Sequence, residues 1–177
     1  MPFTPPPVAD VLAGLADRFG PLETSSFRGQ TRVVVPAERA FAVFEFLKAR
    51  GFDLLVDVSC VDYLEYRDPP MGMPAVAGRR YGLVYLLAST TTNQRLTLRV
   101  FLDDPDPAVP SAVPLWEAAN WLEREVWDLF GIRFEGHPDL RRLVMPEEFT
   151  AHPLRKDYPL QGRGERHNFP VITRHES

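Results

Sequence analysis

The chain has 177 residues, the length of one ordinary domain with a single hydrophobic core. Its 45% hydrophobic and 25% charged residues are typical of folded globular proteins and exclude the disordered and fibrous classes. A net charge of -4 argues against a phosphate-binding surface, and one cysteine excludes an internal disulfide, an all-cysteine iron–sulfur cluster and a four-cysteine zinc site within this chain.

Two helices and a strand are predicted in the first fifty residues. Apolar residues over 8–19 fall on one helical face and are followed by Gly20, a stop signal. The β-branched run 31–35 predicts a strand. Apolar residues recur at helical spacing over 37–50, and Gly51 supplies the expected C-terminal stop of this second helix.

Three further strands are predicted in the middle of the chain. Residues 53–61 read as a largely buried strand, followed by a proline- and glycine-rich loop through residue 78. Residues 81–89 and 95–102 predict a hairpin, and alternation in its second strand predicts one buried face. Four prolines between 105 and 114 predict an extended linker.

A third helix is predicted over 115–130, ending at Gly131. Its three tryptophans are spaced by five and six residues, so at least one indole should be exposed or covered by another chain. They are Trp116, Trp121 and Trp127. From residue 132 onward, five prolines and the lack of a clear period predict an extended arm.

These elements predict an α+β fold: a two-layer single domain, with a mixed β-sheet packed by helices, plus an extended C-terminal arm. The predicted boundaries are a body at 1–131 and a proline-rich arm at 132–177. No stretch approaches the roughly 18 to 20 apolar residues that a membrane-spanning helix needs. We therefore expect a soluble chain that reaches a membrane only through partners.

Side chains that could carry chemistry favour structural roles. Glu125 and Asp128 share a helix face and Arg124 can pair with Asp128, but without a nearby nucleophile a solvated or docking surface is favoured over acid–base catalysis. The four histidines lack metal-ligand spacing, and His137 before proline is expected to order a turn. Cys60, between valines, is expected to be buried and inert.

An intermittent basic track runs along the predicted arm. Acidic residues interrupt it, which favours an ion-paired protein interface over nucleic acid, and no glycine-rich phosphate loop accompanies it. The track consists of Arg141, Arg142, Arg155, Lys156, Arg163 and Arg166.

Two motifs carry a family resemblance. The run EREVWDLFGIRFEGHPDLRRL at 123–143, with HPLRKDYP at 152–159, resembles the C-type subunit, also called the 30-kilodalton-type subunit, of respiratory complex I. The resemblance covers about 40 residues strongly, and residues 30 to 160 follow the family's order more loosely. The two motifs together are far more restrictive than a generic helix or capping pattern.

The resemblance implies a cofactor-free structural subunit of proton-translocating NADH:quinone oxidoreductase. Such a subunit belongs to the peripheral, quinone-side arm on the cytoplasmic face of the bacterial cell membrane. The implied partners are the quinone-pocket subunit of D type and the cluster-bearing subunits, which hold FMN and iron–sulfur clusters. NADH and quinone are then substrates of the complex, and no catalytic activity is expected of the isolated chain.

We expect no catalytic, cofactor-binding or metal-binding residue in this chain, and we expect the motif residues to form the partner interface. The expected interface residues are Glu123, Arg124, Glu125, Trp127, Asp128, His137, Asp139, Arg141, Arg142, Arg155, Lys156, Asp157 and Tyr158.

The sequence leaves three alternatives open. The nearest is the equivalent subunit of a ferredoxin-dependent photosynthetic complex or a membrane-bound hydrogenase. The second is a free-standing hydrolase that uses Glu125, Asp128 and His137, and the third is a nucleic-acid module that uses the basic arm.

Overall fold

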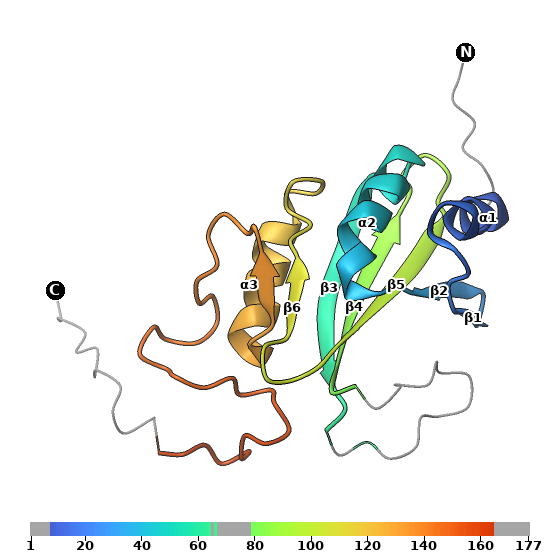
Figure 1. Cartoon of the computed structure of the whole chain (residues 1–177). Helices are drawn as coiled ribbons and strands as arrows, with labels where there is room; N and C mark the ends of the chain where they lie inside the picture. Colours follow the sequence, from blue (N-terminus) through green and yellow to red (C-terminus); the bar gives the residue numbers. More distant parts are fainter. Residues whose placement is uncertain (1–7, 65, 67–78, 165–177) are drawn as a thin grey trace, which may run out of the picture.

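The computed structural model describes residues 8–64, 66 and 79–164, and it has the predicted α+β architecture (Figure 1). The expectations for Arg166 and for the loop over 67–78 lie outside the described residues, as does the arm after residue 164. In chain order the elements are α1 (Val8–Phe19), β1 (Thr24–Phe27), β2 (Gln30–Val34), the 3-10 helix η1 (Ala37–Arg39), α2 (Ala40–Ala49), β3 (Leu54–Asp62), β4 (Tyr81–Ala88), β5 (Arg95–Leu102), β6 (Ala108–Pro110), α3 (Ala119–Phe130) and β7 (Arg133–Glu135).

The main sheet has five strands in the order β1-β2-β5-β4-β3. Its neighbours pair antiparallel except β2 and β5, which are parallel. The chain passes through α2, β3 and β4 between these two strands. A second, two-stranded parallel sheet joins β6 to β7. The predicted mixed sheet and the predicted 81–102 hairpin are therefore confirmed.

The core lies between one face of the sheet and helices α1 and α2. Alternate residues of β4 and β5, such as Tyr85 and Leu98, are fully buried toward these helices. Phe44 of α2 packs on Tyr85 with ring centroids 4.8 Å apart. In Figure 1, α2 lies across the sheet, while α3 and the β6–β7 pair lie beside the outer strand β3.

The expectation that β5 buries only one face was wrong. Thr97, Arg99 and Phe101, on the face expected to be exposed, are only 8%, 8% and 7% exposed. Tyr63, which follows β3, lies against this face, with its ring centroid 6.3 Å from that of Phe101. For Arg99 and Phe101, a side chain from a distant part of the chain thus overrides the local alternation.

Two boundaries also differ from the prediction. The polar sequence TSSF gave no strand signal, yet it forms β1 as the short outer partner of β2. The third helix begins at Ala119 rather than Leu115, because residues 112–118 form turns after the proline-rich linker. The end of that helix is as predicted: Gly131 has a left-handed φ of 75°, which glycine adopts without strain.

The three tryptophans divide as expected. Trp116 is buried in the core, Trp127 is half-buried and Trp121 is 60% exposed. Among the described residues, no helix has the length and apolar character to cross a membrane.

Candidate docking surface on α3 and the C-terminal segment

Asp128 of α3 is a buried anchor for the chain that follows the helix. One carboxylate oxygen accepts hydrogen bonds from three successive backbone N–H groups, those of Leu143 (2.9 Å), Val144 (2.7 Å) and Met145 (2.9 Å). The other oxygen accepts one from the Arg142 guanidinium at 2.5 Å. Burial alone would raise the pKa of Asp128, but these hydrogen bonds outweigh it and hold the pKa below its ordinary value.

Arg142 is the matching cation. Its side chain is 11% exposed, and that of Asp128 is 0% exposed. Its guanidinium also donates to the backbone carbonyls of Asp128 at 3.3 Å and Ala151 at 3.1 Å. One arginine therefore ties α3 to two separate parts of the C-terminal segment, which we define as residues 136–164.

The C-terminal segment also caps α3. A helix leaves its last four carbonyls without intrahelical partners, and here each of the four accepts a hydrogen bond. The pairs are Trp127 O with Gly131 N (2.8 Å), Asp128 O with His152 Nδ1 (2.9 Å), Leu129 O with Leu154 N (3.0 Å) and Phe130 O with Arg155 Nε (2.6 Å). Since a carbonyl only accepts, Nδ1 of the histidine carries the proton.

Gly131 makes this capping possible because it has no side chain, as well as through its left-handed φ. A Cβ atom built at Gly131 would lie 2.6 Å from the imidazole of His152 and would overlap the guanidinium of Arg155. A side chain at position 131 would therefore push the segment off the end of the helix.

A second ionic cluster ties the C-terminal segment to the main sheet. Arg80 donates to Asp62 through Nε (3.2 Å) and Nη2 (3.0 Å), and it pairs with Asp104 at 2.7 Å and Asp157 at 3.0 Å. The backbone N–H of Lys156 donates to Asp62 at 2.8 Å. Burial would raise the pKa of Asp62, but these hydrogen bonds hold the pKa below its ordinary value. The ends of β3 and β5 and the C-terminal segment therefore meet at Arg80.

Glu123 is also fully buried, but it has a different set of partners. Its carboxyl group accepts a hydrogen bond from Ser111 Oγ at 2.6 Å and one from the backbone N–H of Ala112 at 2.7 Å. Burial raises the pKa of Glu123 to about 7, because these two hydrogen bonds only partly offset the loss of hydration. Glu123 thus fastens α3 to the chain that follows β6.

Replacing Glu123 with glutamine should remove a pH dependence of stability. Because the pKa of Glu123 is higher in the folded chain than in the unfolded chain, stability falls as the pH rises from about 4.5 to about 7. The difference between this pKa and the ordinary value of 4.5 corresponds to about 3 kcal/mol of folding stability, which is lost once the pH is above about 7. Urea unfolding of the purified chain between pH 5 and pH 8 should show this loss in the wild type and a flatter profile in Glu123→Gln. Parallel profiles would contradict it.

The pairing expected between Arg124 and Asp128 is absent among the described ion pairs. Asp128 pairs with Arg142 instead, and Arg124 donates to the backbone carbonyls of Arg141 and Arg142, each at 3.2 Å. Asp128 is therefore not part of a solvated helix face, because the C-terminal segment covers it.

His137 orders a turn, as expected. Its Nδ1 accepts a hydrogen bond from the backbone N–H of Asp139 at 3.0 Å, and its Nε2 lies 3.1 Å from the carbonyl oxygen of Asn120. Both ring nitrogens of His137 are therefore engaged within the chain, as is the carboxylate of Asp128. Neither arrangement favours the hydrolase alternative.

The expected interface residues fall into three groups by burial. The exposed ones are Glu125, Asp139, Arg141, Lys156 and Asp157. The half-buried ones are Trp127, His137, Arg142, Arg155 and Tyr158. The buried ones are Glu123, Arg124 and Asp128. These residues therefore lie on α3 and the C-terminal segment, and eight of the thirteen are buried or half-buried.

Large apolar side chains are exposed on the same two elements. Trp121 of α3 is 60% exposed, with the Arg124 guanidinium 5.0 Å from its ring centroid. The exposed members on the C-terminal segment are Leu143, Val144, Leu154 and Leu160. We call Trp121 and these four residues, which share α3 and the C-terminal segment, the apolar docking patch.

The interface residues expected from the sequence include Trp127, but they do not include Arg80, Asp62 or Trp121. Asp62 is the last residue of β3 and Arg80 directly precedes β4, so no local spacing joins them. The burial of Glu123 did have a signal, since Ala119, Glu123 and Val126 share the buried helix face at spacings of four and three. Among the described residues, no cluster of three or more histidine, cysteine, aspartate or glutamate side chains is arranged to hold a metal ion.

A family model described as the 30 Kd subunit of respiratory-chain NADH dehydrogenase matches residues 33–164. The chain belongs to this family. The match spans both ionic clusters, so the anchored C-terminal segment lies within the family's region. The resemblance carried by the two motifs is confirmed.

Two relatives show how much of the family's length the chain spans. The C-type subunit of NADH-quinone oxidoreductase from Trichlorobacter lovleyi is 46% identical over 144 residues, which are 81% of this chain and 83% of the relative. The C-type subunit from Thermus thermophilus is 44% identical over 145 residues, which are 79% of this chain but 66% of the relative.

Two solved structures share the fold. The trypsin-resistant fragment (1-134) of Nqo5 is 39% identical, with a TM-score of 0.64, over 75% of this chain and 98% of the fragment. The membrane-bound sulfane sulfur reductase, an archaeal respiratory membrane complex, contains a chain with a TM-score of 0.72 over 96% of this chain. At 19% identity, this second likeness concerns the fold alone.

Proposed function

We propose that the chain is a cofactor-free structural subunit of the peripheral, quinone-side arm of proton-translocating NADH:quinone oxidoreductase. It lies on the cytoplasmic side of the bacterial cell membrane and reaches the membrane only through the complex. Electrons pass from NADH to quinone through FMN and iron–sulfur clusters that partner subunits hold. The chain contributes no redox group and has no catalytic activity alone.

The observation that carries this proposal is the anchoring of an irregular segment by buried ion pairs. Residues 136–164 contain no described helix or strand, yet Asp128, Arg142 and Arg80 fix them to α3 and to the sheet. An irregular segment held so firmly, with apolar side chains exposed along it, presents a preformed surface to a partner. A preformed surface loses little conformational entropy on binding, which suits a permanent subunit.

The interface residues then have two roles. The exposed ones, such as Arg141 and Lys156, contact the partner directly. The buried ones, such as Asp128 and Glu123, act by positioning the surface.

We propose the quinone-pocket subunit of D type as the principal partner, with the cluster-bearing subunits beside it. A Methylococcus capsulatus relative whose name joins the C and D types in one chain is 42% identical over 157 residues that make up 26% of its length, which supports this choice.

Replacing Trp121 with alanine tests the docking patch. The indole is exposed in the chain by itself, so its removal should leave the free energy of unfolding of the purified chain within about 0.5 kcal/mol of the wild-type value. Buried interface tryptophans contribute about 2 kcal/mol or more to binding. The amount of assembled complex in native membranes should therefore fall severalfold, with unchanged turnover per assembled complex.

Glu45→Ala, at an exposed position of α2, is the control and should leave assembly unchanged. If Trp121→Ala assembles as well as this control, the exposed indole of α3 is not part of the interface.

A further inference from the structure

We call the side of the main sheet that is turned away from α2 the open face. It combines exposed aliphatic side chains with arginines. The register places Leu86, Thr97 and Arg32 side by side across β4, β5 and β2 on this face. At its β3 edge, Leu54 is 43% exposed and Val56 is 51% exposed. Such aliphatic side chains on a sheet normally pack against another layer.

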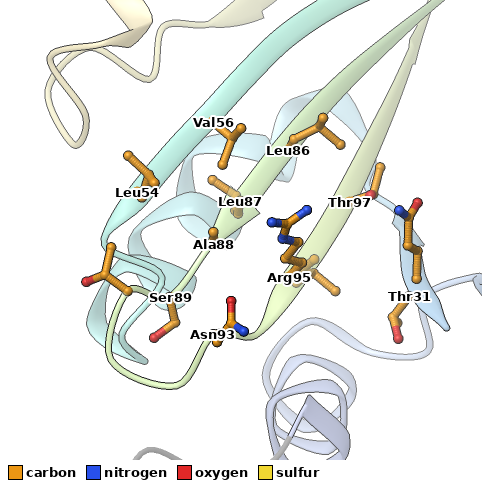
Figure 2. Close-up of a pocket in the computed structure, with 13 residues that line it drawn as sticks. Thr31, Leu54, Val56, Leu86, Leu87, Ala88, Ser89, Asn93, Arg95 and Thr97 are labelled. Carbon is orange, nitrogen blue, oxygen red and sulfur yellow. The ribbon is translucent and has the colours of Figure 1, made fainter.

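The open face is hollowed where these strands meet. A pocket of about 450 Å³ lies over the ends of β3, β4 and β5 and the start of β2. Leu54, Val56 and Leu86 form its apolar side (Figure 2). The guanidinium of Arg95 extends into the space between Leu86 and Thr97. One wall is thus aliphatic and another presents a cation.

Three arginines of this face have no carboxylate partner among the described ion pairs. Arg95 is exposed, Arg32 lies beside the Phe27 ring at 5.2 Å, and Arg99 is only 8% exposed. Among the described residues Nε of Arg99 has no hydrogen-bond partner, while its Nη1 donates to the hydroxyl of Tyr63 at 3.5 Å. A cation this buried ordinarily has a carboxylate beside it.

We propose that the open face binds an extended segment of a partner protein that carries carboxylates beside aliphatic side chains. The carboxylates lie along Arg95, Arg99 and Arg32, whose planar forks suit bidentate pairing. The aliphatic side chains fill the pocket against Leu54 and Val56. Charge complementarity selects this occupant, because a second copy of the chain would bring the same cations together and a nucleic acid would leave the aliphatic wall unused.

The open face is separate from the docking patch on α3 and the C-terminal segment. A result that contradicts binding at the open face therefore does not contradict the proposed function. A photo-crosslinking amino acid at position 56 or at position 49 of α2, both exposed, is introduced into the tagged full chain in cells. The complex is then irradiated in native membranes and captured.

Position 56 should cross-link to a partner peptide that contains aspartate or glutamate, and position 49 should not. Charge reversal at the pocket, Arg95→Glu, should lower the yield from position 56 about tenfold, which corresponds to about 1.4 kcal/mol. The same reversal on α1, Arg18→Glu, should leave the yield unchanged.

Three results would overturn the proposal. They are the absence of a cross-link from position 56, a cross-link to lipid, nucleic acid or a second copy, and a yield that Arg95→Glu and Arg18→Glu lower equally. Co-capture of partner subunits through the tag reports independently whether the chain is part of a complex.

Discussion

Replacing Asp128 with alanine should release residues 143–145 and the rest of the C-terminal segment from α3. The change removes the acceptor for three backbone N–H groups and leaves the Arg142 cation without its partner in a mostly buried site. Breaking one side of a buried ion pair costs about 3 to 5 kcal/mol. Limited proteolysis of the purified chain should show faster cleavage within 136–164 while the remainder persists.

The matched control is Glu125→Ala, which removes an exposed carboxylate from the same helix. It should leave the rate of proteolysis unchanged, and Glu45→Ala on α2 is again the control for assembly. In native membranes, Asp128→Ala should sharply lower the amount of assembled complex but leave turnover per assembled complex nearly unchanged. Full assembly with strongly reduced turnover would instead mean that Asp128 acts in the reaction.

Replacing Gly131 with alanine should have a comparable effect through sterics alone. The new methyl group would overlap Arg155 and lie 2.6 Å from His152, so both side chains would have to leave the end of α3. The carbonyls of Asp128 and Phe130 would then lose the hydrogen bonds that these two side chains donate. Together with the strained left-handed backbone, this should cost about 3 kcal/mol or more.

Gly136→Ala is a close control. Gly136 has a φ of 78°, almost the same as that of Gly131 at 75°, but a Cβ atom built there meets nothing within 4 Å. The difference between the two variants in the free energy of unfolding therefore isolates the clash. Equal losses in urea unfolding would mean that the contact with His152 and Arg155 contributes nothing.

The sequence predicted well those features that local periodicity determines. The helix that ends at Gly131 and the hairpin over 81–102 follow from side-chain spacing and a glycine stop, and both are present. The order of strands was not predictable from spacing, because the parallel pairing of β2 with β5 joins residues far apart in the chain.

The site was predicted at the level of segments, not of contacts. The motifs identified α3 and the following chain, but the pairing of Asp128 with Arg142 depends on how an irregular segment returns across the helix. Arg80 lay outside both motifs, and its role arises only when the ends of β3 and β5 and residue Asp157 meet. The division of the chain into a body and a partner-wrapping arm at residue 131 stays a prediction.

In its proposed role, this chain works as a subunit of NADH:quinone oxidoreductase. The most direct test is to extract native membranes with a gentle detergent, capture a tagged copy of the chain, and assay the captured material for flavin, iron and NADH:quinone activity. We expect all three to arrive together. Iron without flavin would instead indicate a related complex with another electron donor, and capture of the chain alone in several detergents would contradict the proposed role.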